Sequence, residues 1–163
     1  MVVQINPEDI PGDDPLRGLL YQEQLEQLAF EQVKQAAVAP AQRMRDFVEG
    51  RASKDLPACS YLPGIVPSRL DQWLPAKIRK RLQQGFRDFD KKYPGFLTNE
   101  AIIVGVESRS SSAVRIPRDP ETLESISTPG LYPCGEGAGY AGGITSSALD
   151  GINAALKIAE KGQ

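Results

Sequence analysis

The chain has 163 residues, of which 40% are hydrophobic and 25% are charged, and its formal net charge is −2. This length suits one core, or one core with a helical appendage, and the small net charge gives no electrostatic sign of nucleic-acid or anionic-membrane binding. The sequence has no histidine, which excludes a Cys/His zinc site and every histidine-dependent catalytic triad. No metal site is expected.

The sequence shows no targeting or membrane segment. No apolar run approaches the ~18 residues needed to cross a bilayer, and the first residues, "MVVQINPEDIPGDD", lack the basic flank and apolar core of a signal peptide. We therefore expect a cytoplasmic protein. Cys59 and Cys134 could pair in a disulfide, but the favoured interpretation is two reduced, buried thiols.

Residues 1–14 are predicted to form a strand and a loop. "MVVQI" has strand character from its first residue, with no polar lead-in, and "NPEDIPGDDP" has the proline and aspartate content of a loop. We expect this region to continue from a missing upstream part of the protein.

Residues 15–94 are predicted to be a helical insertion or cap region. Apolar residues at three- and four-residue steps predict an amphipathic helix from Pro15 to Ala39, with a polar face rich in Gln and Glu. "AQRMRDFVEG" predicts a short helix closed by Gly50. A loop of Pro, Gly and Ser follows it.

Two more helices are predicted after residue 67, one short and one long. In the longer helix Ile78, Leu82, Phe86 and Phe89 form an apolar stripe. The basic run Lys77–Arg81 lies on its other side. This run could bind phosphate or be an ordinary solvated surface.

Residues 95–163 are predicted to contain strands and a closing helix. "EAIIVGVES" and "SAVRIP" are rich in β-branched residues and predict strands, and "DPETLESISTPG" predicts a polar connector. "GLYPCG" predicts a short buried strand, and Gly142–Lys161 predicts the helix. The chain is thus expected to be an α/β (α+β) fragment with a large helical insertion.

The glycine-rich stretch Gly130–Gly151, "GLYPCGEGAGYAGGITSSALDG", is the most distinctive feature of the sequence. Gly137, Gly139 and Gly142 spell G-x-G-x-x-G between a predicted strand and a predicted helix. A Rossmann unit also needs a second strand and an acidic residue ~20 residues further on, and the chain ends before both. The pattern is therefore not interpreted as a dinucleotide-binding fingerprint.

Two interpretations of these glycines remain open. They could only allow the closing helix to pack tightly on its strand, or they could expose bare backbone and a helix N-terminus to an electron-rich or anionic ligand. Glu136 favours a ligand, because a carboxylate beside a helix start is suited to accept hydrogen bonds from ribose-like or ribityl hydroxyls.

Several segments together resemble one protein family. They are "APAQRMRDFVEG", "LPGIVPSRLDQWLP", "GVESRSSSAVRIPRD" and "STPGLYPCGEGAGYAGGITSSALDGINAA". The last is similar to the C-terminal flavin-binding segment of two-dinucleotide-binding-domain flavoproteins. The combination resembles the bacterial FAD-dependent dehydrogenases related to the HI0933-like and BaiN-type flavoproteins, over Val2 to about Ala155.

The resemblance implies that FAD is the cofactor. It implies that Glu136 hydrogen-bonds the ribityl chain and that backbone N–H groups around Gly142, Gly143 and Ile144 face N1 and the C2 carbonyl of the flavin. Tyr140 would pack near the flavin ring or elsewhere in the protein. The implied cofactor-binding residues are Gly135, Glu136, Gly137, Ala138, Gly139, Tyr140, Ala141, Gly142, Gly143 and Ile144.

A second group of candidate residues lies in "GVESRSSSAVRIPRD". Its arginines and serines supply many hydrogen-bond donors, suited to a carboxylate or phosphate near the flavin or the substrate. The candidates are Arg109, Ser110, Ser111, Ser112 and Arg115. Alternatively, the arginines here, Arg118 included, are surface residues that pair with Glu107, Asp119 or Glu121.

The family pattern also indicates what is absent from the sequence. Such flavoproteins bind the ADP half of FAD with an N-terminal G-x-G-x-x-G unit, and nothing before residue 100 offers one. The chain is therefore predicted to be the C-terminal part of a two-domain FAD-binding Rossmann-like flavoprotein.

The predicted protein is an FAD-dependent oxidoreductase with NAD(P)H as electron donor and an unknown small-molecule substrate. Its missing N-terminal region completes the site, and no catalytic residue is assigned. The alternatives are a non-catalytic helical interaction domain and a flavoprotein that modifies tRNA.

Overall fold

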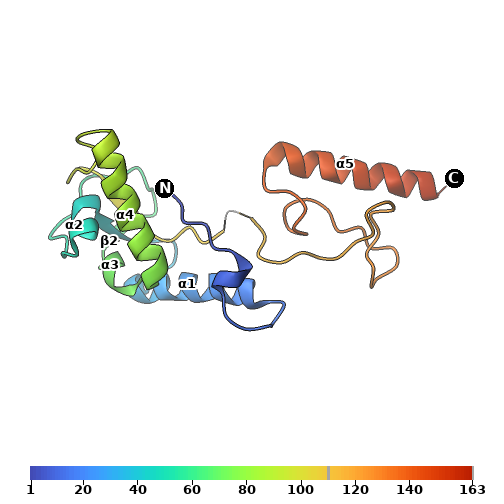
Figure 1. Ribbon diagram of the computed structural model, residues 1–163, viewed down its shortest axis with the longest axis horizontal. Helices are drawn as coiled ribbons and strands as arrows, with labels where there is room; N and C mark the ends of the chain where they lie inside the picture. Colours follow the sequence, from blue (N-terminus) through green and yellow to red (C-terminus); the bar gives the residue numbers. More distant parts are fainter. Residues whose placement is uncertain (110, 163) are drawn as a thin grey trace. The chain divides into compact units, whose positions relative to one another are not determined.

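The computed structural model describes residues 1–109 and 111–162. These residues divide into two compact units, the first made of residues 1–9 and 23–108 and the second of residues 10–22 and 109 onward. Helix α1 (Arg17–Val33) contributes to both units. Figure 1 labels helices α1 to α5 and strand β2.

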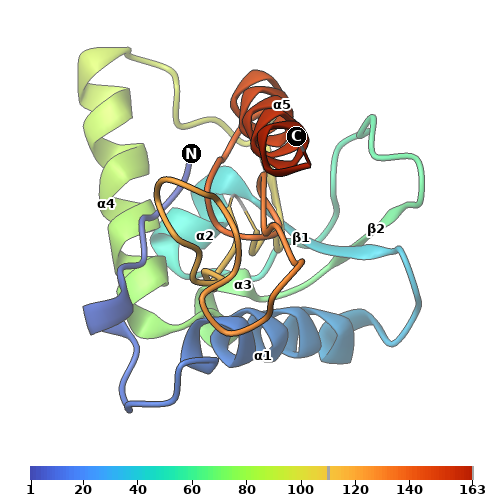
Figure 2. The same cartoon turned by 90° about the vertical axis from the view of Figure 1, so that its right-hand side faces the viewer.

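A small mixed sheet organises the first unit. Strand β1 (Ala39–Arg43) is central, with β2 (Ile65–Pro67) parallel on one side and β3 (Ile102–Val104) antiparallel on the other. Figure 2 shows β1 and β2 running side by side. Ala39–Gln42 are buried, so the middle of the sheet is part of the interior of this unit.

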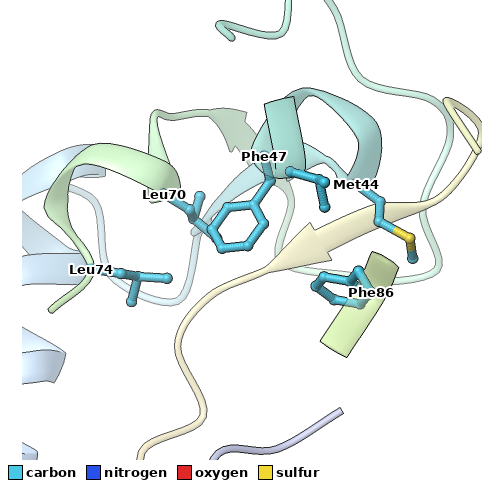
Figure 3. Close-up of a cluster of buried hydrophobic side chains, with 6 residues drawn as sticks. Met44, Phe47, Leu70, Leu74 and Phe86 are labelled. Carbon is cyan, nitrogen blue, oxygen red and sulfur yellow. The ribbon is translucent and has the colours of Figure 1, made fainter. Parts of the chain in front are cut away.

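The hydrophobic core lies between the sheet and three helices, α2 (Met44–Glu49), α3 (Leu70–Trp73) and α4 (Ala76–Lys92). Phe47 is fully buried, and its ring meets that of Phe86 edge to face at a centroid distance of 6.2 Å. Figure 3 shows these side chains together. The buried core residues are Met44, Phe47, Val48, Leu70, Leu74 and Phe86.

A buried polar network joins the sheet to α3. Gln42 is fully buried, and its amide donates to the Asp71 carboxylate at 2.6 Å while its oxygen accepts the Asp71 backbone N–H at 3.1 Å. Burial alone would raise the pKa of Asp71, but hydrogen bonds from Arg69 and Gln42 outweigh it and the net effect lowers the pKa. The network satisfies polar groups that would otherwise destabilise the core.

The basic run on α4 holds the N-terminal segment of the first unit. Lys77 pairs with Asp9, which lies in the 3-10 helix η1 (Pro7–Asp9), and Arg81 donates to the carbonyl of Gln4. The hydrogen bond from Lys77 lowers the pKa of Asp9. Much of the positive charge of this run is therefore engaged by the protein itself.

The second unit is built around one long helix, α5 (Ile144–Lys161). Apart from the first residues of α1, the rest of its described chain is irregular, with one isolated antiparallel bridge between Arg118 and Ser125. Its buried apolar side chains include Ala138 and Ala154. Polar and backbone contacts therefore carry much of its structure.

The α/β class is confirmed, with a three-stranded sheet and five α-helices in the described residues. The strand near "EAIIVGVES" and the helix from about residue 142 are also confirmed. The long first helix is confirmed over Arg17–Val33, shorter than predicted at both ends. Gly50 ends α2 in the left-handed conformation, as predicted.

Other predicted elements are wrong. The predicted helix "AQRMRDFVEG" begins only at Met44, because its first residues form the central strand β1. The strands predicted at "MVVQI", "SAVRIP" and "GLYPCG" do not form. In α4 Leu82 and Phe86 pack on the core as the stripe predicts, but Phe89 is 45% exposed and stacks near Phe96.

Within the described residues, no helix is both long enough and apolar enough to cross a membrane. The same part of the chain contains no group of three or more His, Cys, Asp or Glu side chains that could hold a metal ion.

Phe47→Ala tests the core of the first unit. Removing this buried ring should lower the free energy of unfolding by about 3–5 kcal/mol, because it leaves a cavity. The control is Phe89→Ala, which truncates an exposed ring of the same size and should lower it by less than about 1 kcal/mol. Urea unfolding followed by circular dichroism measures both, and equal losses would contradict the assigned core.

Candidate functional site

The glycine-rich turn joins an irregular segment to α5. The Gly139 N–H donates to the Glu136 carbonyl at 2.9 Å, and the Tyr140 N–H donates to the Gly135 carbonyl at 3.1 Å. Gly135 and Gly139 have φ values of +72° and +83°, which favour glycine. The backbone from Gly135 to Tyr140 is therefore a closed, hydrogen-bonded turn.

The turn leads directly into the N-terminus of α5. Gly143 is the N-cap residue, with extended backbone. The Ser146 hydroxyl accepts the Gly143 N–H at 3.2 Å and donates to the Gly143 carbonyl at 3.0 Å. Among the described residues, the N–H groups of Gly142 and Ile144 have no hydrogen-bond acceptor. Such unsatisfied donors are the usual anion-binding groups of a helix start.

The glycines of the turn differ in the space around them. A Cβ on Gly139 would lie 2.6 Å from the Val114 carbonyl oxygen and 3.0 Å from Arg115 Cα. A Cβ on Gly137 or Gly142 would meet nothing within 4 Å. The fold of this chain therefore requires glycine at 139, whereas open space lies beside Gly137 and Gly142.

Segment 112–118 forms hydrogen bonds to the turn. The Ile116 N–H donates to the Ala138 carbonyl at 3.1 Å, and Arg115 Nε donates to the Gly139 carbonyl at 3.0 Å. The Ser112 hydroxyl lies 2.8 Å from the Val114 carbonyl and 3.3 Å from that of Gly137. These donors therefore bind carbonyl groups of the protein's own backbone.

Tyr140 fixes the end of the turn. Its hydroxyl donates to the Ile116 carbonyl at 2.9 Å and accepts the Arg118 backbone N–H at 3.1 Å. The centroid of its ring lies 3.7 Å from the guanidinium carbon of Arg118 and 5.0 Å from that of Arg115. The ring therefore packs on two cations within this unit.

Arg118 and Asp150 form an ion pair that the sequence did not reveal. Arg118 Nη2 lies 2.7 Å from Asp150 Oδ1 and Nη1 lies 3.0 Å from Oδ2, and the two side chains are 9% and 15% exposed. Asp150 Oδ2 also accepts the Gly135 N–H at 2.8 Å. The Arg118 hydrogen bond lowers the pKa of Asp150 against an opposing effect of burial, and the Gly135 N–H lowers it further.

The sequence offers Glu107, Asp119 and Glu121 as nearby partners for the arginines of this segment. Arg118 instead pairs with a carboxylate 32 residues away. The available signal was Asp150 itself, the only acidic residue in the otherwise small and apolar run "ITSSALDGINAAL" at the start of α5.

Glu136 and Ile144 face outward from the turn and the start of α5. Glu136 is exposed, and no described residue forms a hydrogen bond or ion pair with its carboxylate. Ile144 is 94% exposed. The turn thus presents an unpartnered carboxylate and an apolar side chain beside the open glycines and the free N–H groups.

The remaining predicted site residues lie in different environments. Gly135 and Ala138 are buried and Ala141 is half-buried, whereas Arg109 and Ser111 are exposed. Ser110 lies outside the described residues. Both cysteines are free as expected, but Cys59 and Cys134 are exposed, so their predicted burial is wrong.

A separate hollow lies in the first unit, and its charges are largely paired. Arg43 is bound by Asp55 at 2.8 Å, and Arg51 is bound by Asp46 at 3.0 Å. This leaves little unpaired charge for a ligand. The hollow is lined by Arg43, Asp46, Arg51, Ala52, Lys54, Asp55 and Asn99.

Comparison with known proteins adds two findings. Residues 1–110 match the family described as FAD-dependent protein, C-terminal domain-like, and the matched region ends before the glycine-rich turn. An uncharacterized protein of Clostridium beijerinckii is 44% identical over 163 residues, which cover 99% of this chain and 30% of that protein. The chain therefore spans less than a third of the length of this relative.

Gly139→Ala tests the requirement for glycine inside the turn. We expect the free energy of unfolding to fall by more than about 1 kcal/mol, because alanine is disfavoured at this positive φ and its Cβ would collide with the Val114 carbonyl. Gly137→Ala is the matched control and should change stability by less than about 0.5 kcal/mol. Urea unfolding measures the free energy of unfolding of both variants, and similar losses in the two would refute the assigned packing.

The Arg118–Asp150 pair predicts a pH dependence of stability. Because the pKa of Asp150 is lowered by folding, its contribution is complete above its unfolded pKa of about 3.9 and is lost as the pH falls through the lower folded value. The urea midpoints of the unaltered chain and of Asp150→Asn are compared at each pH, so that the contributions of the other carboxylates cancel. The difference between the two midpoints should shrink below about pH 4, and a constant difference down to pH 2 would contradict the pairing.

Proposed function

The chain belongs to the FAD-dependent protein C-terminal domain-like family, and on that basis we propose that it is the C-terminal part of an FAD-dependent oxidoreductase that contributes the flavin-facing turn. The observation that carries the proposal is the outward face of the turn. It combines the unpartnered Glu136 carboxylate with open glycine backbone at Gly137 and Gly142.

The residues present fit a flavin on chemical grounds. The Glu136 carboxylate offers two acceptor oxygens, and the hydroxyls of a ribityl chain are suitable donors. The spaces beside Gly137 and Gly142 would be narrowed by any larger side chain. Close approach of a ligand to the backbone gives these positions a reason to be glycine that the packing of the chain does not.

The start of α5 supplies the electrostatic part of the site. The free N–H groups of Gly142 and Ile144 and the positive end of the helix dipole favour negative charge on a neighbouring group by about 0.3–2 kcal/mol. The Gly143 N–H is bound by Ser146, so the donors available to the N1 and C2 carbonyl edge of a flavin are those of Gly142 and Ile144. When bound, FAD supplies the hydride or electron transfer.

The chain's own residues then have limited tasks. Glu136 binds and orients, and the α5 N-terminus stabilises charge. The braced turn keeps both in place. Arg115 and Ser112 support the turn through its carbonyls, while Arg109, Ser110 and Ser111 stay proposed contacts near the flavin or substrate. No residue is proposed as a general acid or base.

The exposed face of α5 is proposed to pack against the rest of a longer polypeptide. Leu149, Ile152 and Leu156 follow helical spacing and are 56%, 56% and 57% exposed. A large apolar stripe of this kind normally has a partner. The relative extends well beyond the segment that this chain matches, and the proposed partner is the FAD-binding Rossmann-like region.

The wider parts of the proposal rest on sequence patterns and on the family resemblance alone. They are the division at residues 14 and 94, membership of the HI0933-like group, NAD(P)H as electron donor, an organic small-molecule substrate and a cytoplasmic location. A tRNA-modifying flavoprotein is less favoured, because part of the basic run on α4 is engaged by Asp9 and Gln4. A role as an interaction domain alone is less favoured, because it makes no use of the open backbone beside Gly137 and Gly142.

The full open reading frame that encodes this chain tests the function. We expect the purified protein to bind FAD stoichiometrically, with the visible absorbance of a flavin, and to oxidise NADH or NADPH. Glu136→Gln should weaken FAD binding about 10- to 100-fold, since hydrogen bonds to a charged group contribute about 1.5–3 kcal/mol. Gly142→Ala should weaken it as well.

The controls separate binding from folding. Both substitutions lie at open positions, so the unfolding free energy of the 163-residue chain should stay within about 0.5 kcal/mol of its original value. The chain alone is expected to bind FAD weakly or not at all. A full-length protein without flavin affinity, or unchanged affinity in both variants, would refute the proposed site.

A further inference from the structure

The position of Glu136 depends on the backbone directly before it. Its carboxylate has no partner among the described residues, so nothing in the side chain's own contacts sets its direction. The preceding residue, Gly135, has a positive φ that an unrestrained glycine can leave at low cost. A fixed Glu136 therefore requires a fixed Gly135.

Asp150 holds Gly135 from α5. Its Oδ2 accepts the Gly135 N–H at 2.8 Å, and the same carboxylate is held on both oxygens by Arg118. Gly135 also lies close to α5, where an added Cβ would be 3.7 Å from Ser147 Cβ. The start of the turn is thus tied to the second turn of the helix whose N-terminus lies beside Gly142.

Arg118 holds both ends of the turn. Its Nη1 donates to the Pro133 carbonyl at 2.8 Å, its guanidinium carbon lies 3.7 Å from the Tyr140 ring centroid, and its backbone N–H donates to the Tyr140 hydroxyl. One side chain therefore contacts the residues before and after the segment 135–139. The planar fork of arginine permits these contacts together with the two-oxygen pairing, whereas a lysine could not make all of them.

We propose that Arg118 and Asp150 are a positioning pair, which fixes Gly135 and Tyr140 relative to α5 so that the Glu136 carboxylate and the N–H groups at the start of α5 face one bound flavin. This inference rests on the proposed function. Neither residue contacts the ligand. Their effect is to pre-organise the turn, which reduces the ordering needed when FAD binds.

Two opposing effects act on a nearly buried ion pair. Desolvation offsets much of the attraction between the partners, but removing one partner leaves the other charge buried and uncompensated. Arg118→Lys keeps the charge and Asp150→Asn keeps the shape of the side chain, so both variants test the geometry of the pair. The same unit offers a comparison pair, Lys161 with Glu124 at 2.5 Å. Glu124 also accepts the Gly130 N–H, which lies outside residues 133–140.

The test uses Arg118→Lys, Asp150→Asn and Lys161→Ala in the full open reading frame and in the chain alone. In the full-length protein, the first two should weaken FAD binding at least tenfold and alter the visible spectrum of the bound flavin, whereas Lys161→Ala should do neither. In the chain alone, the Gly135 amide should exchange with solvent at least tenfold faster in Arg118→Lys and Asp150→Asn, with helix content retained. If one of these variants fails to fold, the other carries the test.

Three results would overturn the inference. They are unchanged FAD affinity and spectrum in both positioning variants, equal weakening by Lys161→Ala, and unchanged exchange of the Gly135 amide. Absence of flavin from the unaltered full-length protein would instead defeat the proposed function and, with it, the flavin-directed role of the pair. Gly135 exchange would then still show whether the pair fixes the turn.

Discussion

The second unit depends on the ion pair between Arg118 and Asp150. The regular elements among its described residues are helical, and the buried apolar side chains there are small, among them Ala138 and Ala154. Burial of apolar surface therefore contributes less here than in the first unit. The pair joins segment 112–118, the glycine-rich turn and α5 at one point. A loop of this kind keeps its shape through specific hydrogen bonds.

The first unit, in contrast, is held together mainly by a hydrophobic core. A sheet and helices enclose Phe47, Leu70 and Phe86, and the buried polar groups of Gln42 and Asp71 satisfy one another. The family match covers this whole unit, whereas the proposed flavin-facing turn lies in the other. The region matched by the family and the proposed chemistry therefore lie in different parts of the chain.

Local sequence patterns predicted the elements that local physics determines. Periodicity identified α1 and α4, and Gly50 marked the end of α2. "APAQR" gave no strand signal, because alanine and glutamine are poor strand formers, and burial between β2 and β3 determines its conformation. "SAVRIP" has the composition of a strand, but its backbone bonds to the glycine-rich turn instead of a neighbouring strand. The Arg118–Asp150 pair was missed since contacts distant in sequence leave no local pattern.

The placement of Trp73 has a spectroscopic consequence. It is the sole tryptophan of the chain, it packs against the core of the first unit, and its indole N–H donates to the Ser68 hydroxyl at 3.0 Å. Tryptophan emission therefore reports on the first unit, whereas far-ultraviolet circular dichroism reports on the helices of both units. Disagreement between the two signals during denaturation would reveal units that melt independently, and coincidence would reveal cooperative unfolding across their boundary.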